Sequence, residues 1–595
     1  MGYDDFMVRM SKGMTNQEVA ELLKLMGAAH EAKKENFFVV RAYQNAAASI
    51  EHATSDIRDL WQEGKLKELA GIGGNIAGYL DELFRTGKVK HFEEEMRGLP
   101  EGMFEILTVS GIGPKSAIRL AREFKLVKGS LALKKLQEVA KKGLIAKLEG
   151  FGEEKQKKIL EAIEEKIKRK GSRERLLLPE AELLAEEIKN YLKGSELVEE
   201  VEALGSLRRK TATVGDVDLA VKTEKPDRVM VYLAKFPGIK KIISTGEKTT
   251  MFIHKSGRQV DVKTQSGDKW GSILQHYTGS KLHNIHLRQV ALEKKMSLSE
   301  HGIKKNGKLF EYETEEDFYK ALGMDYIPPE LREDVGEIEL AMKHRLPSLV
   351  ELTDIRGDFH LHTNLPIETS HDMGANSVRE LVAKAGGLGY EYVGLSDHNP
   401  KLLGLSENKR IEVIKRRNEA IDKQIRSSEN GVKVFKGLEV DIRPDGELAI
   451  SDESLELLDY AVVSVHSSLD QNKIEATKRI LAGLAHPNVR IWGHPTGRIL
   501  NQRDGLDYDW EKVLEFCRDN NIWVEINASP MRLDLPDVLV REAVKMGVKI
   551  VIDTDSHAVE QMDSMKYGVA VARRGWAEKR DVINTLPLSD MMKMV

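Results

Sequence analysis

Hydrophobic and polar residues follow three successive patterns along the chain, and each pattern predicts a different kind of structure. Residues 1–170 form short helical stretches separated by glycine turns, and residues 153–193 continue with long amphipathic helices. Residues 200–265 add runs in which apolar and polar residues alternate, as they do in half-buried β-strands. After residue 355, short apolar runs are separated by amphipathic segments. The chain is therefore predicted to contain a helical, a mixed and an α/β part.

The α/β part contains seven strand candidates, which predict a parallel barrel. They are GDFHLHT (357–363), EYVGLSDHN (391–399), VKVFKGLEVDI (432–442), YAVVSVHSS (460–468), VRIWGHP (489–495), IWVEINAS (522–529) and VKIVIDTDSH (548–557).

Side chains with metal-ligand chemistry lie at the carboxyl ends of these candidate strands, where barrel active sites are built. The set, with Asp372 taken from the loop after the first strand, is His360, His362, Asp372, His398, Glu439, His466, His494, Asp555 and His557. So many nitrogen and oxygen donors predict two or three bridged metal ions. His371 and His486 are left outside the set. Glu525 and Asn527 are predicted to orient ligands, and Arg498 to contact phosphate.

A second group of acidic residues lies in the mixed part. Asp216 and Asp218 alternate in an apolar run, so a strand places both carboxylates on one face. We expect Asp261, in a second run, to lie beside them through antiparallel pairing. Three carboxylates suit Mg²⁺ or Mn²⁺ in phosphoryl transfer. The alternative interpretation is a solvated strand edge.

Residues just before these carboxylates can bind an anion. Gly205 and Ser206 let backbone and hydroxyl approach a phosphate, and Arg208 and Arg209 offer guanidinium groups suited to a triphosphate.

The helical part repeats a glycine turn three times. Each turn places two glycines around one apolar residue before a helix, whose free N–H groups can bind a phosphate without reading base sequence. The residues are Gly71 and Gly73, then Gly111, Gly113 and Lys115, then Gly150 and Gly152. Residues 111–170 hold 17 basic and 8 acidic residues, a surplus that suits a phosphate-facing surface. The alternative interpretation of any single turn is a glycine that only caps the end of a helix and binds no phosphate.

Length and composition limit the kind of protein that this sequence can encode. The 595 residues provide enough material for three or more domains, and the single cysteine, Cys517, excludes a disulfide framework and fits a reducing compartment. There is no long apolar run and no secretory signal pattern, so we expect no membrane association and a cytoplasmic location. The overall net charge is only −4.

The motif GS-x-RR followed by GDVD and a later strand Asp resembles the family X DNA polymerases, nucleotidyltransferases that include polymerase beta. The resemblance implies that Asp216, Asp218 and Asp261 bind catalytic metal ions and that Gly205, Ser206 and Arg209 contact the triphosphate. Lys210 stands where the family often has glycine. In WGSILQHYTGSKLHNIHLR (270–288), the thumb motif implies nucleotide or minor-groove contacts at His276, Tyr277, Gly279, Asn284 and Arg288.

The glycine turns resemble helix-hairpin-helix motifs, for which a bound monovalent cation is a further expectation. In polymerase beta the first such region carries a lyase lysine. Here that position is Tyr79, so we predict weak or absent lyase activity unless Lys88 or Lys90 substitutes.

The ligand order HxH, D, H, E, H, H, DxH resembles the polymerase and histidinol phosphatase (PHP) domain, and the whole chain resembles the bacterial and archaeal PolX enzymes. The expected domains are an N-terminal helical domain (1–100), fingers (101–170), a palm (171–265), a thumb (266–332), a linker (333–352) and a distorted (β/α)₇ TIM-like PHP barrel (353–595).

The resemblance implies a gap-filling, template-directed DNA polymerase of base excision repair, joined to a phosphoesterase with 3′→5′ exonuclease activity that uses two or three Mn²⁺ or Zn²⁺ ions. The expected partners are gapped or nicked DNA and dNTPs, and we expect a monomer. Open alternatives are a small-molecule phosphatase or an abasic endonuclease in the barrel, a terminal transferase in the palm, and a DNA-binding scaffold with decayed sites.

Overall fold

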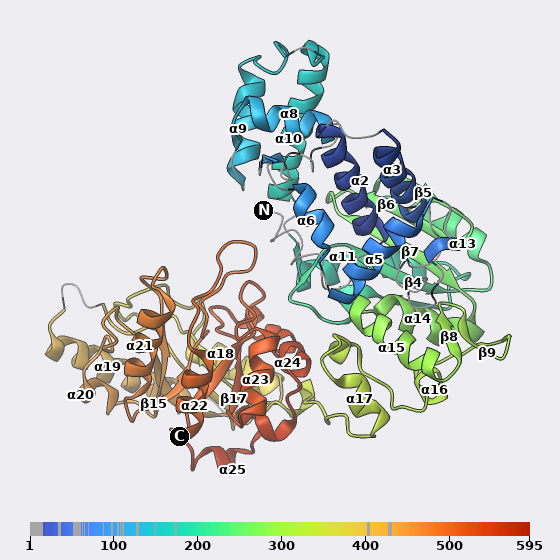
Figure 1. The fold of residues 1–595 in the computed structure, drawn as a ribbon. Coiled ribbons are helices and arrows are strands. Elements are labelled where there is room, and N and C mark those ends of the chain that lie inside the picture. The colour runs from blue at the N-terminus through green and yellow to red at the C-terminus, as the bar shows by residue number, and fades with distance from the viewer. Residues whose placement is uncertain are drawn as a thin grey trace. The chain divides into compact units, whose positions relative to one another are not determined.

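The computed structural model divides the chain into two compact units, residues 1–174 and 175–595 (Figure 1). It describes residues 16–33, 37–51, 57, 61, 64, 66–68, 71–86, 88–96, 99–100, 102–103, 106, 109, 112, 114–126, 130–148, 150–172, 175–401, 405–426 and 431–595.

The first unit is helical in its described residues, as the 3.6-residue period predicts. Its elements are α2 (Asn16–Ala32), α3 (Phe37–Glu51), η1 (Leu66–Glu68), α5 (Gly74–Thr86), α6 (Lys90–Met96), α8 (Pro114–Glu123), α9 (Ser130–Lys141) and α10 (Gly152–Ser172). The helices bury a common apolar core that includes Leu80, Phe92 and Leu136. A stripe of such residues on each amphipathic helix is enough to join them into one unit.

The second unit begins with a five-stranded sheet of order β2-β4-β7-β6-β5. The elements of this palm region are β1 (Leu176–Leu177), α11 (Leu178–Lys193), β2 (Glu200–Ala203), α12 (Gly205–Arg208), β3 (Thr213–Val214), β4 (Val217–Lys222), α13 (Pro226–Leu233), β5 (Ile239–Thr245), β6 (Thr249–His254) and β7 (Gln259–Gln265). Our expectation of antiparallel pairing was wrong. β7 pairs antiparallel with β6 on one side and parallel with β4 on the other, and Asp218 of β4 lies opposite Asp261 of β7.

A mixed region follows the palm. Its elements are η2 (Gly267–Lys269), α14 (Trp270–Thr278), α15 (Lys281–Glu293), β8 (Met296–Ser299), β9 (Gly302–Lys305), β10 (Lys308–Phe310), α16 (Glu315–Ala321), η3 (Pro329–Leu331), α17 (Glu337–Met342) and η4 (Leu352–Asp354). The buried Arg332 binds Glu315, which also accepts a hydrogen bond from Arg208 of the palm. This ion triad ties the two regions together.

The remaining residues form seven parallel strands in the order of the chain, which confirms the predicted barrel class. The strands are β11 (Gly357–Leu361), β12 (Tyr392–Leu395), β13 (Lys433–Asp441), β14 (Tyr460–Ser464), β15 (Val489–Trp492), β16 (Trp523–Asn527) and β17 (Ile550–Asp553). An isolated bridge between Leu361 and Ser556 brings the first and last strands together, so the barrel is nearly closed.

Helices cover the outside of these strands (Figure 1). They are α18 (Val378–Gly387), α19 (Glu407–Ile425), α20 (Asp452–Leu455), α21 (Lys473–Leu484), α22 (Trp510–Asp519), α23 (Asp537–Lys545), η5 (Val559–Ser564), α24 (Met565–Arg574), η6 (Lys579–Asp581), η7 (Ile583–Thr585) and α25 (Leu588–Met591).

An aromatic layer fills the barrel below its polar end. Tyr392, Phe435, Tyr460 and Trp523 pack together from four different strands. Each lies an even number of residues before a polar side chain of the candidate site, so the strand period of two places both layers on one face. Gly437 is required here, because a Cβ at this position would lie 2.5 Å from the Tyr460 ring.

Candidate functional site

The palm carboxylates lie on neighbouring strands. Asp216 is exposed immediately before β4, while Asp218 on β4 and Asp261 on β7 are partly buried. Burial, followed by the charges of Asp216 and Asp261, raises the pKa of Asp218 to about 6, although Lys263, 3.7 Å away, opposes the shift. Burial likewise raises the pKa of Asp261. Burial and the neighbouring charges therefore disfavour the anionic forms of Asp218 and Asp261, a situation that a divalent cation would relieve.

A short turn holds the phosphate-binding candidates against these carboxylates. Gly205 has φ +57°, and a Cβ on it would lie 2.7 Å from Asp218 Oδ2, so glycine lets the turn approach the strand. Ser206 follows in α12. Arg209 caps that helix and donates to Glu333 Oε1 at 3.0 Å and to the carbonyl of Thr278 at 2.5 Å. Lys210 adopts φ +55°, the left-handed conformation that glycine favours.

One of the predicted thumb residues lies beside this turn, and the others contact Lys263 or one another. Gly279 is close to Arg209, since a Cβ on it would be 3.2 Å from Nη1. Lys263 lies over the Tyr277 ring, 4.8 Å from its centroid. Asn284 donates to the carbonyl of His276 at 2.6 Å and accepts from Gln275. Arg288, the last of the predicted thumb residues, donates from its Nε to the carbonyl of Asn284.

The described glycine turns precede helices as predicted. Gly73 is exposed, and a Cβ on it would meet no atom within 4 Å, so the backbone at the start of α5 is open. Gly71, Gly150 and Gly152 all have positive φ, the conformation that the motif requires of glycine. Gly111 and Gly113 lie outside the described residues. Lys115 lies in the first turn of α8.

Tyr79, at the position of the lyase lysine, is stacked on His91 with ring centroids 4.6 Å apart. Burial raises its pKa further above the usual value of a phenol. Lys88 and Lys90 are exposed.

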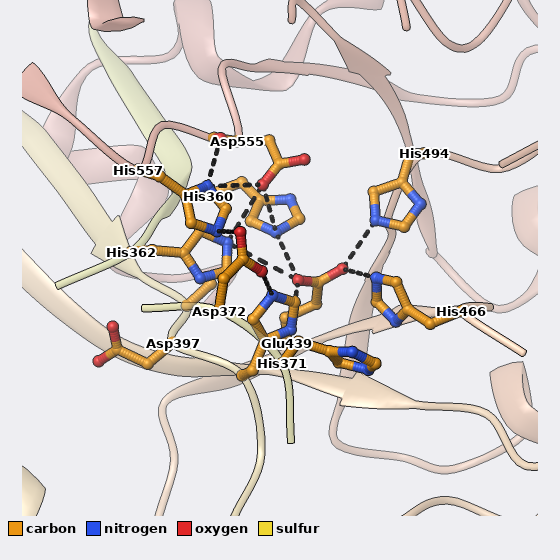
Figure 2. A network of polar contacts seen from close by, with 12 residues as sticks. His360, His362, His371, Asp372, Asp397, Glu439, His466, His494, Asp555 and His557 are labelled. Carbon is orange, nitrogen blue, oxygen red and sulfur yellow. Dashed lines mark hydrogen bonds and ion pairs between the residues drawn. The ribbon is translucent and has the colours of Figure 1, made fainter. Parts of the chain in front are cut away.

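Glu439 is at the centre of the barrel site, where Figure 2 shows its carboxylate among the histidines. Oε1 faces His494 Nε2 at 2.8 Å and His466 Nε2 at 3.3 Å. Oε2 faces His398 Nδ1 at 3.0 Å and His360 Nε2 at 3.3 Å. A carboxylate whose two oxygens face different pairs of histidines is placed to bridge two metal ions.

Asp555 forms a second centre of the same site. Its Oδ1 lies 3.2 Å from His362 Nε2 and 3.7 Å from both His360 Nε2 and His557 Nδ1. Asn527 donates to the other oxygen at 3.0 Å. The carboxylate is thus oriented from behind, towards the histidines.

Asp372 reaches the site from its long loop. One oxygen lies 3.4 Å from His398 Nε2 and the other 3.5 Å from His557 Nε2. A hydrogen bond from His398 lowers the pKa of Asp372 well below its usual range. The structure therefore brings all nine predicted ligands together.

Several nitrogen and oxygen atoms of this site are buried without any hydrogen-bond partner, which fits a role as metal ligands. They are His360 Nε2, both ring nitrogens of His362, His398 Nδ1, Glu439 Oε2, His494 Nδ1 and His557 Nε2. Burial lowers the pKa of His362 and of His494 to about 4, so both rings are neutral and can offer a lone pair.

The groups behind the ligands fix their orientation. Glu525 accepts from His360 Nδ1 at 2.6 Å, as expected, and Asp441 accepts from His466 Nδ1 at 2.6 Å. Burial lowers the pKa of His466, but Glu439 and Asp441 outweigh it and raise the value to about 10. A metal ion bound by His466 would displace its proton, so ion binding would release protons.

Three residues of the site, His371, Asp441 and Arg532, were missed from sequence. His371 was left outside the set, yet its Nε2 lies 3.0 Å from Asp441, and with His466 these residues group as possible ligands. Arg532, not Arg498, lines the cavity of about 120 Å³ at the site. Arg498 instead donates to the carbonyls of Arg532 and Leu533. Asp441 could have been found, because it lies two residues after Glu439 on one strand.

In the part of the chain that the structure describes, every helix is too short or too polar to cross a membrane.

Comparisons with known proteins assign families to three parts of the chain. A DNA polymerase beta thumb model matches residues 273–333, a helix-hairpin-helix domain model matches residues 14–89, and a PHP domain model matches residues 358–529. The chain is 33% identical over 582 residues to the "DNA polymerase/3'-5' exonuclease PolX" of Bacillus subtilis (strain 168), covering 97% of this chain and 99% of that protein. It is 27% identical over 238 residues to a "Probable phosphatase" of Thermoanaerobacter sp. (strain X514), covering 38% of this chain and 89% of that protein.

Proposed function

Because this chain belongs to the PolX family of DNA polymerases, we propose that it fills gaps in DNA by template-directed nucleotidyl transfer and trims DNA 3′ ends in its barrel. The single observation that carries the two-activity proposal is the presence of two separate acidic centres in one unit. One lies on β4 and β7, and the other is built around Glu439. The palm centre offers three carboxylates, which suit Mg²⁺ in nucleotidyl transfer, whereas the barrel centre combines histidines with carboxylates, which suit Mn²⁺ or Zn²⁺ in phosphodiester hydrolysis.

For the palm we propose Mg²⁺ or Mn²⁺ held by Asp216, Asp218 and Asp261. The ions would neutralise charge on the triphosphate and lower the pKa of the primer hydroxyl. Arg209 and the Gly205-Ser206 turn hold the triphosphate, and Tyr277 lies against the nucleotide sugar. Two observations support this arrangement: a Cβ on Gly205 would lie 2.7 Å from Asp218 Oδ2, and Lys263, which lies over the Tyr277 ring, is 3.7 Å from Asp218.

For the barrel we propose two or three Mn²⁺ or Zn²⁺ ions held by the nine ligands. The ions would supply an activated water and charge neutralisation at the terminal phosphodiester. Arg532, which lies 3.7 Å from Asp555 and lines the cavity, binds the phosphate. Glu525 and Asp441 keep their histidines in the tautomers that ligands need.

The glycine turns are proposed to hold the DNA backbone, with gapped or nicked duplex and dNTPs as partners and a single chain as the active form. The open backbone at Gly73 and the basic surplus of residues 111–170 support this role.

A time course on a short gapped duplex labelled at the primer 5′ end, with Mn²⁺ and with or without dNTPs, tests the proposal. We expect Asp216→Ala/Asp218→Ala to abolish extension and keep primer shortening, and His360→Ala/His362→Ala to do the reverse. Primer shortening that survives the barrel substitutions would overturn the exonuclease assignment, and release of phosphate from small monoesters would then favour a phosphatase. Extension of blunt primers without a templating base would favour a terminal transferase.

A further inference from the structure

Helix α24 of the barrel faces the palm with one of its sides. Its other side is packed on the barrel, where a Cβ at Gly568 would lie 2.5 Å from Ile552. Tyr567, Arg573 and Arg574 of this helix all form hydrogen bonds with residues between 182 and 351. The helix is therefore fixed to the barrel and connected to the polymerase region at the same time.

Arg574 connects the barrel directly to the predicted triphosphate-binding arginine. Its side chain is only 9% exposed, and Asp537 of the barrel accepts from its Nε at 2.7 Å. Its Nη1 donates to the backbone carbonyl of Arg209 at 2.8 Å and to Glu333 Oε1 at 3.0 Å. A guanidinium anchored in this way can hold the backbone of Arg209 with little freedom.

Glu333 is shared between two guanidinium groups. The same Oε1 that accepts from Arg574 also accepts from Arg209 Nε at 3.0 Å. If Arg574 were absent, Arg209 alone would balance the negative charge of Glu333. The backbone carbonyl of Arg209 would also lose the hydrogen bond from Arg574. Both effects make the Arg209 guanidinium less available to a triphosphate. Glu333 would neutralise more of its charge, and the backbone of Arg209 would be less firmly held in place.

The next residue, Lys210, is linked to the same helix indirectly, through Glu182 of α11. Its Nζ donates to Glu182 Oε1 at 2.6 Å, and Tyr567 of α24 donates to the other oxygen of Glu182 at 3.1 Å. A lysine at φ +55° is unfavourable without such support. Two consecutive residues of the phosphate-binding turn therefore depend on contacts to the barrel.

We propose that Arg574 is a positioning residue of the polymerase centre, through which the exonuclease barrel sets the affinity for dNTPs. The inference rests on the proposed function, in which Arg209 binds the triphosphate. It assigns the barrel a second role, independent of its metal site, in keeping the nucleotide site ready for binding.

Steady-state incorporation of one nucleotide into a one-nucleotide gap, measured with the full-length chain, tests this role. We expect Arg574→Met to raise KM for the dNTP about tenfold, the effect of losing one charge-assisted hydrogen bond. We expect kcat, KM for the gapped DNA and the rate of primer shortening without dNTPs to stay within about twofold. Arg574→Lys, which keeps the charge but not the forked geometry, should give an intermediate KM.

Arg573→Met is the matched control. Arg573 precedes Arg574 in α24 and binds Glu330 and Glu351, so its loss weakens the same interface without a contact to Arg209. Equal increases in KM for both variants would overturn the proposal, because a general loosening of the interface would then explain them. If Arg574→Met fails to fold, the comparison of Arg574→Lys with Arg573→Met decides in the same way.

Arg209→Lys separates this inference from its premise. A raised KM in Arg209→Lys with an unchanged KM in Arg574→Met would refute the positioning role and leave the triphosphate contact intact. An unchanged KM in Arg209→Lys would refute the triphosphate contact itself. If Arg574 acts through the Arg209 guanidinium, Arg574→Met should raise KM less in the Arg209→Lys background than in the unmodified chain, because the two effects then are not additive.

Discussion

Glu525 is the buried carboxylate that orients a predicted metal ligand from behind, and replacing it by glutamine tests how the barrel holds its ions. Its side chain is fully buried, and its two oxygens accept from His360 Nδ1 and from the backbone N–H of His494. In glutamine one of these oxygens becomes an NH₂ group, which cannot accept. If His360 turns its Nδ1 into an acceptor, its proton moves to Nε2, the atom that faces Glu439 and Asp555. A protonated Nε2 cannot bind a metal ion.

The expected loss follows from the role of such supporting groups. Their removal weakens metal binding by about 10- to 100-fold, which corresponds to about 1.4–2.8 kcal/mol. The measurement is Mn²⁺ affinity, from the free Mn²⁺ signal in electron paramagnetic resonance, together with primer shortening at limiting and at saturating Mn²⁺. We expect activity to recover partly at high Mn²⁺, because the nine ligands themselves remain.

Two controls limit the interpretation. Glu542→Gln changes an exposed carboxylate of the same domain that pairs with Lys545, and it should leave Mn²⁺ affinity unchanged. Gap filling by Glu525→Gln should match the unmodified chain if the domain stays folded. Unaltered Mn²⁺ affinity in Glu525→Gln would refute the claim that Glu525 sets the tautomer of His360.

Three further predictions concern other parts of the chain. Glu315→Gln leaves Arg332 buried beside Arg208 without its anion, so it should lower the free energy of unfolding by about 3–5 kcal/mol in urea titrations, whereas the exposed Glu316→Gln should not. His283 and Glu337 are fully buried partners whose pKa values are both lowered, the first by burial and the second, against burial, by its bond to His283. The unfolded chain then binds more protons, so stability should fall as pH drops below about 6.5 and fall further below about 4.5, and His283→Gln should flatten the upper step in thermal melts across pH. Borohydride should trap no adduct between residues 71–96 and an abasic 5′ sugar phosphate, because Tyr79 cannot form an imine; a trapped peptide containing Lys88 or Lys90 would show that a neighbour substitutes.

The barrel strands could be predicted because each is buried on both faces and bounded by polar residues. The runs around Phe359, Val462 and Ile552 therefore stand out as apolar segments of strand length. The ligands follow from the same pattern, since the carboxyl ends of parallel strands meet at one end of a barrel. Asp441 was within reach of this reasoning, because the period of two places it on the same face as Glu439.

The direction of pairing between β4 and β7 could not be predicted from the alternating runs alone. The short connection between Thr249–His254 and Gln259–Gln265 makes those two strands an antiparallel hairpin, and the position of β7 beside β4 then depends on the whole sheet. His371 was unpredictable for a different reason. It lies on a long loop whose path depends on tertiary contacts, including the one to Asp441. The position of Arg498 was unpredictable because its guanidinium donates to backbone carbonyls, which no side-chain pattern locates.

The two acidic centres differ in how far the protein itself assembles them. In the barrel, Glu439 is 1% exposed, and several ligand atoms around it are buried without a hydrogen-bond partner, so the ligands already converge before an ion binds. In the palm, Asp216 is exposed, and among the described residues the groups of possible ligand atoms within 4.8 Å of one another all lie in the barrel. Carboxylates that repel one another in this way bind Mg²⁺ best when substrate phosphates complete the coordination. The barrel is therefore suited to retain its ions between reactions, whereas the palm is suited to bind its ions together with each nucleotide. Arg574 and Glu333 contact Arg209, the residue of the palm centre that is proposed to bind the nucleotide triphosphate. A positioning residue has its greatest effect on the KM for the nucleotide at such a place.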